Sequence, residues 1–350
     1  MKESLILLGL SRLDSIRKKA DEVSLIDRKE IILRKELSDF TDKLVSLDRS
    51  LYSDDQNNRF FSDIQLVIGW YNALIDNLNT RLSKPIIELL KQISKDWIDA
   101  YDNRVLLVTV GDYATQAGAK IANERFNSDY SISLSILPLI LFVPPHQSDD
   151  LFLGVALLHE LGHMIDYEWG VTSSVVSYII RFCKSGQFKD VDCNPYFSDI
   201  KSINVRHLRE LFADIFGAQY CKESILANVE YWTTDPDASF PSHPSYNNRL
   251  NAVRDFLNNV TTNNYSSKFI KLMAFVMEKV INKPLRVIDE TNDEPSFEKG
   301  ELIEFTTKEQ LYSIFHDSWR AYEKGPRTLD RYNTINSIAL RSLDNHFRGS

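Results

Sequence analysis

The sequence has few of the features that mark disulfide-rich or nucleic-acid-binding proteins. Only three of its 350 residues are cysteine, an odd number without C-x-x-C spacing: Cys183, Cys193 and Cys221. They predict neither a disulfide framework nor a thiolate zinc site. The net charge of −8 argues against a general nucleic-acid binder, which would normally carry a basic surplus.

Long apolar runs are also missing. The apolar stretch at residues 5–10 is short and no small-residue cleavage site follows it, so a signal peptide is not expected. The longest later run, residues 136–145, is interrupted by Pro138 and falls short of the ~18 residues of a membrane span. We therefore expect a soluble, cytoplasmic protein in a reducing compartment, without a membrane span.

The sequence does have enough apolar residues for substantial cores. Its hydrophobic content is 43% against 26% charged residues, which predicts one large or two modest domains. The N-terminal region shows two interleaved heptad series, an a/d seam formed by Ile26, Leu33, Phe40 and Leu47 with Leu37, Leu44 and Leu51.

A second helical pattern between Phe60 and Leu82 would fold back on this seam as an antiparallel hairpin. The hairpin has two interpretations. It is either a partner-binding or oligomerising arm or an internally packed helical domain. Internal packing is favoured because only about three heptads are present.

Two segments then show strand patterns. Residues 104–110 are rich in β-branched side chains, and residues 131–145 alternate before becoming continuously apolar. Pro138 removes a backbone donor, which predicts either an edge strand or bulge, or a strand that ends early. An edge strand here would suit an extended peptide binding by strand addition.

The segment LLHELGHMIDYEWG, residues 157–170, contains the pattern His-Glu-x-x-His. Asp149 and Asp150 are good N-cap residues and Gly170 a plausible stop, so we expect an apolar helix of about twenty residues. By itself the pattern occurs by chance in many helices. The apolar surroundings favour a functional interpretation, since buried polar groups need partners.

His159 and His163 lie four residues apart, so both rings project from one helix face and can reach one metal ion. Zinc prefers such nitrogen ligands and lowers the pKa of a bound water towards ~7, while a neighbouring carboxylate takes up the proton. Glu160 would be that general base. Gly162, between the ligands, would allow another segment to pack closely.

A third ligand is expected on a second amphipathic helix, residues 204–221. Glu210 would complete the ligand set, and Asp214, one turn on, could accept the ring N–H of a ligating histidine. His207 is an alternative third ligand. Glu210 is favoured over it, because Asp214 then has a role as the hydrogen-bond acceptor of a ligating histidine. In the alternative without a metal site, Glu210 and Asp214 form a solvated helix face with two arginines, Arg206 and Arg209.

Residues 239–257 open a further helix at a His-Pro turn. Pro244 suits the first helical position, with Ser242 capping near it. His243 and Arg249 are candidates to stabilise the oxyanion of a tetrahedral intermediate, although such a turn is more often plain capping.

Together the motifs HELGH, ELFAD and HPSYNNRL resemble the gluzincin metallopeptidases, particularly the family of the CAAX prenyl endopeptidase and HtpX. The resemblance covers roughly residues 105–257 and has no counterpart of the transmembrane helices of that family. It implies a zinc-dependent endopeptidase in which His159, His163 and Glu210 bind Zn²⁺, Glu160 is the base, and His243 and Arg249 lie near the scissile carbonyl. Soluble peptidases that cleave repressors in bacterial stress and mobile-element switches are similar.

The expected fold is α+β and mostly helical, a zincin-like metallopeptidase core with a small sheet and edge strand, plus helical extensions. The expected segments are a helical hairpin or coiled-coil-like region at 1–102, the core at 103–285, and an acidic linker with a helical appendage at 286–348. The expected partners are a protein or peptide substrate and a regulatory protein bound by the terminal helices. The alternative function is a non-catalytic interaction protein that acts through its N-terminal helices.

Overall fold

The computed structural model is mostly helical with one small sheet, as expected at this coarse level. It describes residues 3–25, 27–50, 52–79, 83–99, 101–110, 114–116, 119–143, 150–152, 154–185, 205–232, 235–262, 264–288 and 294–349. Within these residues, none of the helices is both long and apolar enough to cross a membrane.

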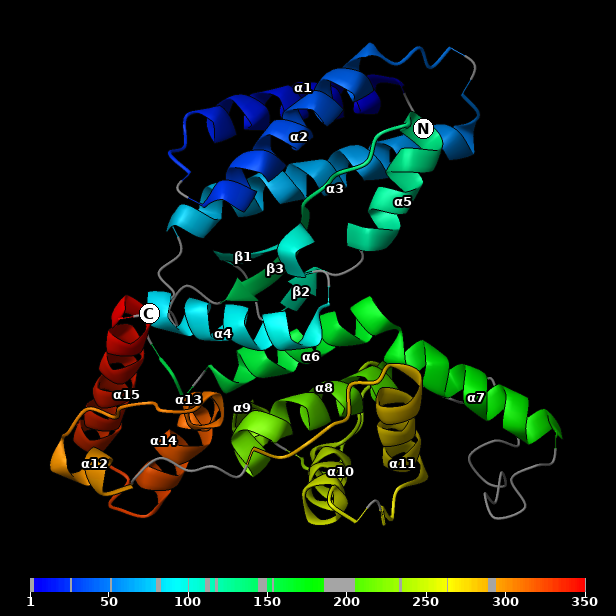
Figure 1. Cartoon of the computed structure of the whole chain (residues 1–350). Helices are drawn as coiled ribbons and strands as arrows, with labels where there is room; N and C mark the ends of the chain where they lie inside the picture. Colours follow the sequence, from blue (N-terminus) through cyan, green and yellow to red (C-terminus); the bar gives the residue numbers. More distant parts are fainter. Residues whose placement is uncertain are drawn as a thin grey trace. The chain divides into compact units, whose positions relative to one another are not determined.

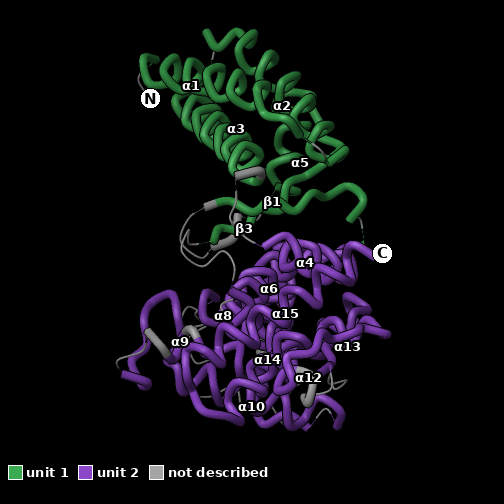
Figure 2. The backbone as a smooth tube through the Cα atoms, turned by 90° about the vertical axis from the view of Figure 1, so that its left-hand side faces the viewer, with its two compact units in different colours: residues 1–82, 99–148 green, residues 83–98, 149–350 purple. Residues whose placement is uncertain are grey.

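The chain forms two compact units (Figure 2). Unit 1 comprises residues 1–82 and 99–148, and unit 2 comprises residues 83–98 and 149–350. This division differs from the three segments expected from the sequence. The sheet belongs with the N-terminal helices and the C-terminal helices belong with the histidine helix, because long-range burial decides these memberships and local composition does not.

Unit 1 consists of helices packed on a small sheet. Its helices are α1 (Glu3–Asp21), α2 (Arg28–Ser46), α3 (Asp54–Asn79) and α5 (Ala119–Tyr130), with a 3₁₀ turn at Tyr101–Asn103. The described residues of the heptad seam enter one core: Leu33, Leu37, Phe40 and Leu44 are fully buried, and Leu47 packs against them. Ile26 and Leu51 lie outside the described residues. The expected internal packing is therefore observed. The structure adds a third helix to the expected hairpin, because α1 packs against both α2 and α3 (Figure 1).

The sheet has three strands in the order β1–β3–β2. Its strands are β1 (Arg104–Val110), β2 (Ala114–Gln116) and β3 (Leu137–Val143). The expectation of an edge strand at Pro138 is wrong, because β3 is central, parallel to β1 and antiparallel to β2. Pro138 is tolerated because β2 pairs only with residues 140–142 of β3. Position 138 therefore needs no backbone N–H for the hydrogen bonds between β2 and β3.

Unit 2 is all helical among its described residues. Its α-helices are α4 (Lys84–Trp97), α6 (Val155–Trp169), α7 (Val171–Ser185), α8 (Val205–Cys221), α9 (Ala227–Trp232), α10 (Tyr246–Asn259), α11 (Lys268–Phe275), α12 (Glu294–Lys299), α13 (Lys308–Tyr312), α14 (Ile314–Glu323) and α15 (Leu329–Gly349). A 3₁₀ turn at Lys222–Leu226 and a π-helical turn at Val276–Val280 continue α8 and α11. α8 packs against both α6 and α10 (Figure 1).

The histidine helix α6 begins later than expected and ends where expected. Asp150 does not cap it; its side chain accepts a hydrogen bond from Phe152 N, and α6 starts after Gly154. Gly170 ends the helix with φ of 62°, a left-handed conformation that glycine adopts without strain. Beyond this corner Asp166 accepts a hydrogen bond from Thr172 N at 2.6 Å, which holds the start of α7 against the end of α6.

The helix that follows the His-Pro turn also starts later than expected. Ser245 caps α10 by accepting a hydrogen bond from Asn248 N. Pro244 therefore precedes the cap instead of occupying the first helical position. The hydroxyl of Ser242, expected to help with capping, instead lies 2.7 Å from Nδ1 of His243.

Candidate metal centre

The two helices that carry the candidate site, α6 and α8, meet at a glycine. A side chain on Gly162 would place its Cβ 2.7 Å from Ala213 Cα and 3.0 Å from Ala213 O, closer than packed atoms approach. Only a glycine allows the backbone of α8 this close to α6. The close packing predicted at Gly162 is therefore present, and it lies between the two histidines in sequence.

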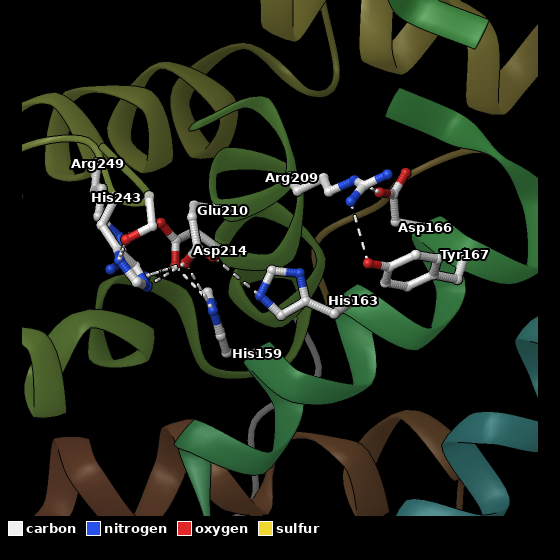
Figure 3. Close-up of polar contacts among 10 residues, drawn as sticks. His159, His163, Asp166, Tyr167, Arg209, Glu210, Asp214, His243 and Arg249 are labelled. Atoms are coloured by element: carbon white, nitrogen blue, oxygen red, sulfur yellow. Dashed lines mark hydrogen bonds and ion pairs between the residues drawn. The ribbon is translucent and has the colours of Figure 1, made fainter. Parts of the chain in front are cut away.

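His159 and His163 both face Glu210 (Figure 3). Nε2 of His159 lies 3.3 Å from Glu210 Oε2, and Nε2 of His163 lies 3.4 Å from Glu210 Oε1. A tetrahedral zinc ion with bonds of about 2.0–2.1 Å separates its ligand atoms by about 3.3–3.4 Å. Each imidazole nitrogen thus lies at such a distance from one of the two Glu210 oxygens, and these separations are compatible with one shared metal ion.

Glu160 also lies close to His159 and His163, and it is nearly buried. One ligand atom each from His159, Glu160 and His163 lies within 4.8 Å of the other two, so this trio also has the spacing of a metal site. Glu210 remains the third ligand expected from the sequence, because one of its oxygens lies 3.3 Å from His159 Nε2 and the other 3.4 Å from His163 Nε2. This assignment leaves Glu160 beside the ligands with its carboxylate available for proton transfer.

Asp214 orients the ring of His159. It is fully buried, and its Oδ1 lies 2.9 Å from His159 Nδ1. An ionised carboxylate can only accept, so Nδ1 carries a hydrogen that it donates to Asp214, and this directs Nε2 towards Glu210. The burial of Asp214 also excludes the alternative in which it forms a solvated face with Glu210.

Arg249, from α10, binds Asp214 through the Nε and Nη2 edge of its guanidinium. Nε donates to Asp214 Oδ2 at 2.7 Å and Nη2 donates to Oδ1 at 2.6 Å, a bidentate pair. The expected position of Arg249 at the scissile carbonyl is therefore not the one observed. A fully buried carboxylate needs a cation, and Arg249 meets that need, remaining 4.0 Å from Glu210 Oε2.

These contacts keep the buried groups charged. Burial alone would lower the pKa of His159, but the hydrogen bonds to Asp214 and Glu210 raise it to about 9. Burial alone would raise the pKa of both carboxyls, yet Arg249 lowers the pKa of Asp214 and the two histidines lower that of Glu210. Such a concentration of perturbed groups is typical of functional sites.

The three motifs do not place the chain in a known family. No family model matches the sequence. No curated protein and no solved structure matches it either. The resemblance to gluzincin peptidases thus remains a prediction, supported by the motifs and by the way the fold brings them together.

His243 approaches the cluster from the solvent side. Its side chain is 52% exposed, and its Nε2 lies 3.6 Å from Glu210 Oε2. A tight turn holds it, in which Phe240 and His243 exchange backbone hydrogen bonds of 2.9 and 3.2 Å. His207, the rejected ligand, supports this turn with its Nε2 2.7 Å from Phe240 O.

The sequence interpretation missed a second polar group beside His163 (Figure 3). Arg209 donates to Tyr167 Oη at 3.1 Å, lies over the Tyr167 ring, and places its Nε 3.6 Å from buried Asp166. Spacing could have revealed it. Tyr167 lies four residues after His163 and Arg209 directly precedes Glu210, so each neighbours a ligand on its own helix.

Proposed function

We propose that the protein is a zinc-dependent endopeptidase with a zincin-like site, in which His159, His163 and Glu210 hold the ion. The observation that carries the proposal is the pair of separations, 3.3 and 3.4 Å, between the two histidine nitrogens and the Glu210 carboxylate. Two imidazoles and a carboxylate are the ligands of hydrolytic zinc enzymes that keep one position open. The gluzincin-like motifs support the same assignment.

A zinc ion bound here would supply Lewis acidity towards water and the substrate carbonyl. Glu160 accepts the proton of the attacking water and delivers it to the leaving amine, which is the task of a general acid–base residue. Its nearly buried position excludes bulk water from that transfer. Glu160 is free for this role, because Glu210 supplies the carboxylate that binds the metal in this proposal.

Other side chains of the cluster position these groups. Asp214 fixes the tautomer of His159 through the hydrogen bond to Nδ1, and Arg249 fixes Asp214. His243 is exposed enough to touch a substrate. It donates a hydrogen bond to the oxygen on which charge develops, a contribution that grows in the transition state.

A metal and activity measurement tests the proposal. The purified protein should bind one equivalent of zinc and cleave peptides from a digest library. Glu160→Gln should keep the zinc and the thermal unfolding temperature while losing activity by ~10²-fold or more, the usual effect of removing a general base. Glu168→Gln makes the same change on the same helix outside the ligand set and should leave activity unchanged.

Two results would contradict this function. The first is a protein that takes up no zinc. The second is a zinc-loaded protein that cleaves no peptide, or cleaves equally well with Glu160→Gln. Absence of cleavage by the zinc-loaded protein would favour the non-catalytic interaction function, in which unit 1, with a core of its own, is the working part, whereas equal cleavage by Glu160→Gln would contradict the role of Glu160.

A further inference from the structure

Arg209 is a partly exposed cation next to a metal ligand, and little of its hydrogen-bonding capacity is used. Its side chain is 33% exposed. Its single hydrogen bond to the described residues runs from Nη1 to Tyr167 Oη. The Nε atom is buried without a hydrogen-bond partner, because Asp166 Oδ2 at 3.6 Å is too distant for one.

The neighbours of Arg209 hold the guanidinium in place. Tyr167 offers its ring face, 4.8 Å from the guanidinium carbon, and its hydroxyl. Asp166 is buried and already accepts a hydrogen bond from Thr172 N, so it attracts Arg209 from the Nε edge. The Nη2 group makes no hydrogen bond with any part of the chain that the structure describes.

The position of the Arg209 guanidinium relative to the proposed metal site suggests that it contacts the substrate. In Figure 3, His243 and Arg249 lie on one side of Glu210, whereas Tyr167 and Arg209 lie on the other, beyond His163. Tyr167 is 43% exposed, so this side is open to solvent too. Because Arg209 directly precedes Glu210 and Tyr167 lies one helical turn after His163, residues next to a bond cleaved at the ligands would pass close to this side.

We propose that Arg209, supported by Tyr167, binds a carboxylate of the peptide substrate close to the cleaved bond and so determines specificity. A guanidinium with paired N–H donors is suited to a carboxylate, which it can bind through two parallel hydrogen bonds. The inference rests on the proposed peptidase function. The carboxylate comes either from an Asp or Glu side chain or from the C-terminus of the peptide.

Matched quenched fluorescent peptides separate these two sources. One series has an amidated C-terminus and carries Glu or Gln at each position within three residues of the cleaved bond. The other series is neutral, ends at those same positions, and has either a free or an amidated C-terminus. We expect kcat/KM to be about 10-fold higher for the carboxylate member at one position, as for a hydrogen bond to a charged group. The ratio should decrease at high salt.

Variants assign the preference to Arg209. Arg209→Gln should bring the ratio close to one, and Arg209→Lys should keep part of it, because the charge remains but the paired donors are lost. Arg254→Gln removes the same charge from an exposed arginine paired with Glu223 and should leave the ratio unchanged. A wild-type ratio of one at all positions, in both series, would overturn the inference while leaving the peptidase function intact.

A binding measurement keeps the two proposals distinguishable. Fluorescence anisotropy of the same peptides with zinc-loaded Glu160→Gln protein needs no turnover. If no peptide is cleaved, the proposed function fails, and the binding ratio alone decides the inference. Tighter binding of the carboxylate peptides that is lost in the Glu160→Gln/Arg209→Gln double variant upholds it, and equal binding overturns it.

Discussion

The two units bury carboxylates in opposite ways. In unit 1, Asp63 is fully buried, accepts a hydrogen bond from Tyr130 at 2.7 Å and pairs with Arg125. Burial nevertheless raises its pKa. In unit 2, Asp214 is just as buried, but Arg249 outweighs burial and lowers its pKa.

The difference comes from the exposure and geometry of the two arginines. Arg125 is 39% exposed at its side chain, so water screens the charge that it offers to Asp63. Arg249 is only 6% exposed and binds through two donors. Unit 2 thus maintains a charged carboxylate in its interior, and this carboxylate accepts a hydrogen bond from a histidine. Unit 1 has no such histidine for Asp63 among its described residues.

The largest effect is expected from removing the two arginines. Arg249→Ala leaves the buried Asp214 with His159 as its one charged partner among the described residues and should lower the unfolding free energy of unit 2 by ~3–5 kcal/mol. Arg125→Ala should cost unit 1 clearly less, because Tyr130 still donates to Asp63 and the raised pKa makes protonation of Asp63 easier. Hydrogen exchange of each unit measures both losses. Equal losses would erase the distinction between the two carboxylates.

A smaller effect is expected at the helix contacts. Gly162→Ala must push α8 away from α6, since its Cβ meets backbone atoms at 2.7 and 3.0 Å. The overpacking should cost ~1–3 kcal/mol and weaken zinc binding. Gly9→Ala in unit 1 meets only side-chain atoms, the nearest at 3.2 Å, so it should cost less. Unfolding and zinc titration of both variants test this, and unchanged zinc affinity in Gly162→Ala would contradict it.

The smallest effect is a difference in acid sensitivity. A lowered carboxyl pKa adds stability above the unfolded pKa of about 4 and loses it as the pH falls, whereas a raised pKa adds stability at low pH. Acidification from pH 6 to about 3 should therefore reduce the Asp214 contribution to unit 2 and favour protonated Asp63 in unit 1. In chelator-treated protein, amides of α8 should lose protection before those of α3. The reverse order would contradict the assignment.

The sequence alone predicts the local parts of this molecule well. Strand β1, the histidine helix up to Gly170, and α8 all follow from hydrophobic periodicity and stop signals. The approach of Glu210 to His159 and His163 also followed from spacing, because i,i+4 pairs on two helices offer few other arrangements.

The remaining features depend on contacts between residues far apart in the chain. Nothing local to Arg249 indicates that it turns to Asp214, since that choice depends on how deeply α8 buries the carboxylate. Likewise the central place of β3 depends on β2, a three-residue strand whose own sequence carries little pattern. The cluster of Tyr167 and Arg209 forms only after α6 and α8 have met.

The membership of α4 in unit 2 has a consequence for synthesis on the ribosome. The chain on either side of α4 belongs to unit 1, but its partners come much later: Trp97 donates to Tyr220, and Asp96 accepts from Tyr312. As the chain emerges from its N-terminus, the apolar face of α4, with Ile86, Leu89 and Ile93, can meet α6 first and its other partners, α13 and α15, only at the end of synthesis. Unit 2 is therefore complete only when its last helices have left the ribosome.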